Sequence, residues 1–153
     1  MDNRSISVAD KVARKLKEIV DKMGGDTLKV GFLEGATYSD GTPVASVAFW
    51  NEFGTTRAGE ERQPPRPFFR TMVAEKSPTW PAQMAQLAKS TGYDGPRVLA
   101  LMGEQIEGDL KESINKFTDP PLAPSTIKAK GFDKPLIDTS HMVNSTGYEV
   151  VKK

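Results

Sequence analysis

Few residues of this chain have side chains suited to acid, base or nucleophilic chemistry. It has no cysteine and a single histidine, His141, so thiolate metal sites and cysteine nucleophiles are excluded and little is left for a Ser/His pair. General acid/base work would need two carboxylates together, for which Glu52 with Asp138 or with Glu104 is the available choice. Solvated or helix-capping carboxylates are more common than such pairs. We therefore expect no catalytic residue, no bound metal and no cofactor.

Arginines gather in residues 54–67, a segment that is rich in glycine and proline. It contains almost no apolar side chain, so the sequence predicts a long exposed loop. Aromatic residues flank it, and we expect them to belong to the core: Phe49, Trp50 and Phe53 before the segment, Phe68 and Phe69 after it. A loop that cannot bury itself is commonly ordered by a partner, and the alternative is a mobile surface loop.

Nucleic-acid binding is a different function that the same segment could serve. The arginines of residues 57–70 could form a stripe that contacts phosphates. Glu60 and Glu61 interrupt this stripe, and 21 basic against 20 acidic residues give a net charge of only +1. A small hydrolase or nuclease is favoured least, because no spacing typical of metal ligands is present.

The remaining sequence predicts a single α+β domain over residues 1–153, a length that suits one domain. Apolar residues recur at helical spacing in 8–23, 79–90 and 98–117, and alternate in the strand-like segments 27–33 and 148–151. Residues 44–53 fit a helix or a strand, and we predict a helix. The expected architecture is a small, mainly antiparallel sheet packed against amphipathic helices. The first helix is amphipathic rather than continuously apolar, so we expect no signal peptide and no membrane segment.

Two details of this pattern can be checked in a structure. Ser7 is placed to cap the helix of residues 8–23. Gly103 and Gly108 interrupt the longest helix, so we expect another element to pack closely against both.

Separate motifs occur along the chain in an order that resembles one known family. They are Val30-Gly31-Phe32-Leu33-Glu34-Gly35-Ala36-Thr37-Tyr38 with Asp40-Gly41-Thr42, then Asn51-Glu52-Phe53-Gly54-Thr55, Pro64-Pro65-Arg66-Pro67-Phe68-Phe69-Arg70 and Lys134-Pro135-Leu136-Ile137-Asp138-Thr139. Together they resemble the tailed-phage neck and tail-completion (head-tail joining) morphogenesis proteins, over about residues 28–145.

The resemblance implies a non-enzymatic, structural role in phage or prophage virion assembly. The partners would be further copies in a ring, or neighbouring neck and tail proteins, close to the DNA of the channel. The location would be the host cytoplasm during assembly and then the tail or neck of the virion. The residues expected at the subunit interface are Phe53, Gly54, Arg57, Arg62, Arg66 and Phe68.

One position departs from the family pattern. The family has a glycine where this chain has Ser140. If that glycine has a positive φ angle, Ser140 must adopt the same conformation at a cost, or the turn must differ.

Overall fold

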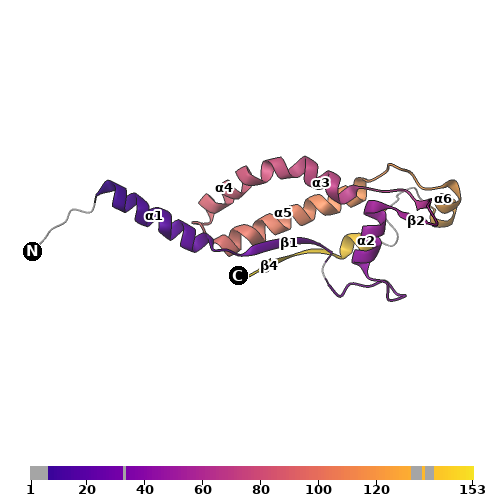
Figure 1. The fold of residues 1–153 in the computed structure, drawn as a ribbon, viewed down its shortest axis with the longest axis horizontal. Helices are drawn as coiled ribbons and strands as arrows, with labels where there is room; N and C mark the ends of the chain where they lie inside the picture. Colours follow the sequence, from indigo (N-terminus) through magenta and orange to yellow (C-terminus); the bar gives the residue numbers. More distant parts are fainter. Residues whose placement is uncertain (1–6, 33, 132–135, 137–139) are drawn as a thin grey trace, which may run out of the picture.

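A computed structural model describes residues 7–32, 34–131, 136 and 140–153 (Figure 1). The predicted α+β class is confirmed. The elements in chain order are α1 (Val8–Met23), β1 (Thr27–Phe32), α2 (Val44–Phe53), β2 (Thr55–Arg57), β3 (Glu60–Gln63), α3 (Phe68–Lys76), the 3-10 turn η1 (Ser77–Thr79), α4 (Trp80–Ser90), α5 (Gly95–Lys116), α6 (Pro124–Lys130), α7 (His141–Asn144) and β4 (Thr146–Val151).

Helix α5 is the centre of the core. Its first turn contains Pro96, and the side chain of Asp94 caps it by accepting a hydrogen bond from the N–H of Arg97 at 3.1 Å. The predicted apolar stripe is buried along its length: Val98, Met102, Ile106, Leu110 and Ile114. Figure 1 shows α5 between the α3–α4 layer and the sheet of β1 and β4.

Strands β1 and β4 pair antiparallel, from Thr27 opposite Val151 to Phe32 opposite Thr146. The sheet lies close to α5 at Gly103, where a Cβ atom would be only 2.6 Å from Cγ of Tyr148. The close packing predicted at Gly103 is thus confirmed. At Gly108 the prediction is wrong, because a Cβ atom there would meet nothing within 4 Å.

The segment predicted as a long exposed loop is instead a β-hairpin, formed by β2 and β3. Its turn residues, Ala58 and Gly59, have φ angles of 54° and 83°, as a two-residue turn that matches the strand twist requires. Most of its side chains are exposed, so the prediction that the segment is exposed is confirmed. The prediction that it has no regular secondary structure is wrong. The prolines that suggested a loop lie after β3 rather than within it.

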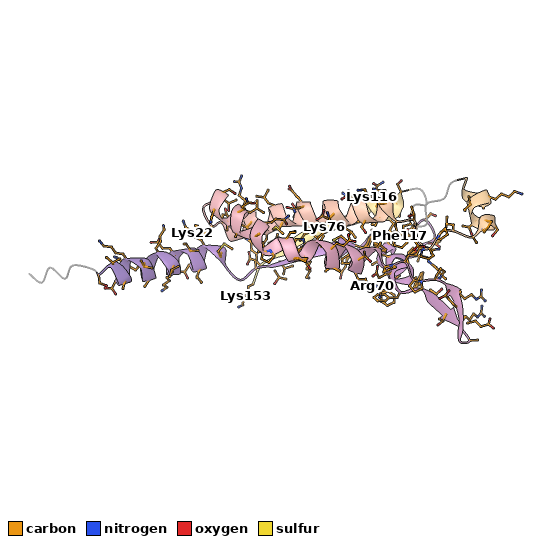
Figure 2. The ribbon with its side chains drawn as sticks, turned by 90° about the horizontal axis from the view of Figure 1, so that it is seen from above. Lys22, Arg70, Lys76, Lys116, Phe117 and Lys153 are labelled. Carbon is orange, nitrogen blue, oxygen red and sulfur yellow. The ribbon has the colours of Figure 1, made fainter. Side chains whose placement is uncertain are left out.

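Helix α1 forms as predicted. The N–H of Asp10 donates to Oγ of Ser7 at 3.1 Å, and Asp10 Oδ2 accepts in return from the N–H of Ser7 at 3.2 Å. No residue of α1 is buried, however. Figures 1 and 2 show α1 running away from one end of the molecule, while the β2–β3 hairpin lies at the opposite end.

Ser140 has a φ angle of 59° and a ψ angle of 11°, immediately before α7. It therefore adopts the left-handed conformation, which costs a residue with a Cβ atom roughly 1 to 2 kcal/mol. Of the last motif, only Leu136 is described, and it is 5% exposed. Asp138 lies outside the described residues. Among the helices of the described ranges, none combines the length and apolar character needed to cross a membrane.

Candidate interaction surface

Glu52, at the end of α2, holds the start of α3. Its carboxylate is 6% exposed and accepts hydrogen bonds from the N–H groups of Phe69 at 2.9 Å and Arg70 at 3.2 Å. Helix α3 has no side-chain cap from its N-cap residue, so Glu52 supplies the acceptors for these N–H groups of its first turn. Glu52 also forms an ion pair with the side chain of Arg70, whose Nε lies 3.2 Å from Glu52 Oε1.

The two carboxylates of the predicted pair have different neighbours: Glu104 accepts from the hydroxyl of Tyr148 at 3.3 Å beside the sheet, whereas Glu52 accepts from the start of α3. Its other candidate partner, Asp138, lies outside the described residues. Glu52 is therefore placed as a helix-capping residue.

Asn51 fixes the root of the hairpin to α2. Its side-chain oxygen accepts from Nε2 of Gln63 at 2.8 Å, and its backbone oxygen accepts from the N–H of Arg66 at 2.6 Å. Arg66 Nη1 also lies 3.4 Å from the Asn51 side-chain oxygen. Arg66 is 7% exposed, and burial lowers the pKa of its guanidinium group.

Gly54 lies where the hairpin leaves α2. Its φ angle is 74°, and a Cβ atom would be 2.6 Å from the backbone oxygen of Gln63 and 2.9 Å from the nitrogen of Pro65. Any other residue would have to separate these two chain segments. Glycine at this position therefore allows the close approach that sets the direction of the hairpin.

Three large aromatic side chains remain exposed on α2, beside the hairpin. Phe49 is 60% exposed, Trp50 45% and Phe53 52%, so the expectation that they belong to the core is wrong. We call these three residues the aromatic patch. The rings of Phe49 and Phe53 lie 4.7 Å apart, and the guanidinium of Arg70 lies 5.3 Å from the Phe53 ring. A largely apolar cavity of about 240 Å³ adjoins Phe49 and Phe53.

Of the six residues predicted at a subunit interface, Gly54 is half-buried at the hairpin root, and the other five fall into two groups. Phe53, Arg57 and Arg62 are exposed. Arg66 and Phe68 are buried, and Phe68 is only 1% exposed, with its ring packed edge-on against Phe32. Within the subunit these two residues position the hairpin and α3, and their place at a subunit interface stays a prediction.

Phe49 and Trp50 belong to the exposed surface but were not among the predicted interface residues. The spacing of residues along α2 indicates that these side chains do not lie on its buried face. Val44, Ala48 and Glu52 share its buried face, while Phe49 and Phe53, four residues apart, share another.

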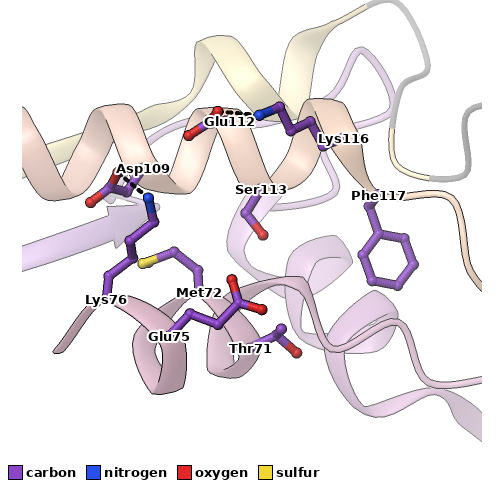
Figure 3. Close-up of a pocket in the computed structure, with 9 residues that line it drawn as sticks. All are labelled: Thr71, Met72, Glu75, Lys76, Asp109, Glu112, Ser113, Lys116 and Phe117. Carbon is purple, nitrogen blue, oxygen red and sulfur yellow. Dashed lines mark hydrogen bonds and ion pairs between the residues drawn. The ribbon is translucent and has the colours of Figure 1, made fainter. Parts of the chain in front are cut away.

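A second, charged cavity of about 360 Å³ lies between α3 and α5 (Figure 3). Lys76 Nζ is 3.4 Å from Asp109, and Lys116 forms an ion pair with Glu112. The hydrogen bond from Lys116 lowers the pKa of the Glu112 carboxyl. The charges of the cavity thus largely pair with one another. Within the described ranges, no three acidic or histidine residues are grouped to hold a metal ion.

The second and third motifs behind the family resemblance meet at the hairpin end of the molecule. Asn51 bonds to Arg66, Glu52 to Phe69, and Gly54 lies against Pro65, which joins the second motif to the third. Compared with protein-family models, curated proteins and solved structures, the chain matches none of them.

Proposed function

We propose that this protein is a non-enzymatic structural subunit of phage or prophage virion assembly, acting in tail completion or head-tail joining through subunit contacts. The observation that carries the proposal is the exposed aromatic patch of Phe49, Trp50 and Phe53. Exposed groups of large apolar side chains are uncommon on proteins that act alone, and aromatic residues are enriched where proteins meet. The patch therefore favours a partner protein.

The environment of the patch adds to this argument. Asn51 and Glu52, on the same helix, bond to the hairpin root and to α3, so the patch is carried on a well-anchored element. A surface that is already ordered loses less conformational entropy when it binds. The resemblance supports the same function, because its second and third motifs supply these anchoring residues.

The partners in this proposal are further copies of the chain or neighbouring neck and tail proteins. Opposite charges face one another across the hairpin, with Arg57 opposite Glu60. A surface of mixed sign suits a protein partner better than a uniformly charged one. The protein would act in the host cytoplasm during assembly and remain in the tail or neck of the virion, without a cofactor.

Incorporation into particles tests the proposal. The double variant Trp50→Ala, Phe53→Ala removes two exposed side chains and should leave the fold intact. We expect it to lower incorporation into tails, or co-purification with tail proteins, by at least about tenfold, because buried aromatic anchors dominate interface energies. Lys89→Glu, an exposed change on α4, is the control and should be incorporated normally. Normal incorporation of the double variant would contradict the proposal.

The alternative, a nucleic-acid-binding module using the arginines of residues 57–70, predicts a different result. Arg66 is buried and Arg70 is paired with Glu52, which leaves Arg57 and Arg62 as the exposed arginines of that segment with no ion pair among the described residues. Two phosphate contacts give a logarithmic salt slope of roughly −2. We therefore expect weak duplex binding with a slope no steeper than this, and tight binding with a steeper slope would favour the alternative.

A further inference from the structure

Helix α1 carries an apolar face that the chain leaves exposed over most of its length. Half of its sixteen residues are apolar and lie on one side: Val8, Ala9, Val12, Ala13, Leu16, Ile19, Val20 and Met23. We call this the α1 face. Val8 is 77% exposed, Leu16 58% and Val20 67%. A stripe this wide is typical of a helix that packs against a protein core.

The same chain contains a groove of matching character. It has a volume of about 310 Å³ and lies between α3–α4, α5 and β1. Its walls are apolar and include Leu28, Phe69, Val73, Trp80, Met84 and Leu99. The groove runs beside β1, which among the described strands pairs only with β4.

The junction after α1 directs the helix away from its own groove. At Gly95, the first residue of α5, a Cβ atom would lie 2.6 Å from the carbonyl carbon of Met23, so the two backbones are in contact. On the other side of the junction, the N–H of Lys153 donates to Asp26 at 3.3 Å. With both ends of the junction held, α1 extends outward (Figures 1 and 2).

The α1 face is long enough for an extended contact. It runs from Val8 to Met23, a rise of fifteen residues or about 22 Å. Half of the lateral surface of a helix about 10 Å wide and of that length is roughly 350 Å². With an equal area from the groove, one contact buries about 700 Å², less than the roughly 1,200 Å² of a stable interface. In a reciprocal pair, two such contacts lie in the same interface and together bury about 1,400 Å².

We propose that the α1 face of one copy binds in the groove of a second copy of this chain. In a reciprocal pair each subunit gives its α1 face to its partner and receives the partner's, so both contacts lie in one interface. The α1 face lacks the aromatic side chains typical of helices that lie on membranes, and acidic residues interrupt its polar side: Asp10, Glu18 and Asp21. The contact adds a second surface to the proposed subunit role and rests on that proposal for its setting in the virion, but it is measured on the purified protein alone.

The mass in solution gives the first test. By sedimentation velocity up to about 100 µM, where contacts of micromolar affinity are populated, we expect a discrete oligomer. Leu16→Glu, on the α1 face, should weaken association at least about tenfold, because a charge replaces a buried apolar side chain. Lys17→Glu places the same glutamate carboxylate on the opposite face of the same helix and should leave association unchanged. A monomer at every concentration would overturn the proposal.

Cross-linking identifies the contact itself, since the chain has no cysteine of its own. Leu16→Cys and Met84→Cys chains are prepared separately, mixed and oxidised. We expect a disulfide-linked pair of the two chains, and none when Lys17→Cys replaces Leu16→Cys.

Three outcomes would overturn the inference: no cross-link between chains, a cross-link only within a chain that carries both cysteines, or a monomer that binds vesicles of phosphatidylcholine and phosphatidylglycerol through Leu16. Each of these would leave the proposed function standing, because the Trp50 and Phe53 variant tests a different surface. Conversely, an oligomer formed through α1 that never enters tails would support the contact and contradict the proposed function.

Discussion

Helices α1 and α5 have the same sequence pattern but differ in burial. Both begin with a side-chain cap, from Ser7 and from Asp94, and both carry apolar residues at spacings of three and four. Helix α5 buries its stripe between two layers of the fold, whereas no residue of α1 is buried. The comparison shows that amphipathic periodicity identifies the face of a helix that needs covering, but not the molecule that covers it.

The largest expected effect compares one leucine from each helix. Leu110→Ala should destabilise the isolated subunit by about 2 to 5 kcal/mol, because Leu110 is fully buried and its removal leaves a cavity. Leu16→Ala should change the stability by less than about 0.5 kcal/mol in dilute solution. Denaturant midpoints measured at low protein concentration provide the check. Similar losses for both variants would mean that α1 is packed within its own subunit.

A second comparison concerns the two glycines within α5. Gly103→Ala should destabilise the fold by roughly 1 to 3 kcal/mol, since the new methyl group would overlap the ring of Tyr148. Gly108→Ala should stabilise it by roughly 0.5 to 1 kcal/mol, because that position is open and alanine favours the helix. Thermal unfolding of the two variants should therefore shift in opposite directions. Equal shifts would show that the sheet does not lie against Gly103.

The sequence predicted most of the features that depend on residues close together in the chain and missed several that depend on residues far apart. The stripe of α5 and the cap at Ser7 involve residues within a few positions of one another, and both predictions are confirmed. The hairpin was missed because Ala58-Gly59 is a weaker turn signal than Asn-Gly. The burial of Arg66 depends on Asn51, fifteen residues earlier, and the capping role of Glu52 on a helix that starts sixteen residues later. No local pattern indicates those contacts.

The cap of α1 provides a smaller effect that stays within one helix. Ser7→Ala should cost α1 about 0.5 to 2 kcal/mol, because the N–H of Asp10 loses its acceptor. Since α1 is not buried in the subunit, helix content measured by far-ultraviolet circular dichroism in dilute solution should fall while the unfolding midpoint of the remainder is unchanged. A shift of that midpoint would indicate that α1 unfolds together with α5.

The smallest expected effect concerns pH at the sheet side of α5. Burial of Tyr148, together with the nearby charge of Glu104, raises the pKa of its phenol. A pKa that is higher in the folded state favours the neutral phenol. Its contribution to stability is therefore complete below the unfolded pKa of about 10 and is lost as the pH rises through the folded value.

Ultraviolet titration of the folded protein should show this phenol ionising at a higher pH than it does in denaturant. Tyr148→Phe, compared with the parent chain, identifies which step of the titration belongs to it. An unchanged step for Tyr148 in the folded and unfolded protein would contradict its packing against α5.

Amide hydrogen exchange followed as a function of protein concentration tests most directly whether another copy covers α1. We expect the amides of α5 to be protected equally at all concentrations, while those of α1 exchange rapidly in dilute solution and become protected as the protein associates. Protection of α1 equal to that of α5 at the lowest concentration would mean that its own subunit covers it. Rapid exchange of α1 at every concentration, with the protein fully monomeric, would mean that no second copy does.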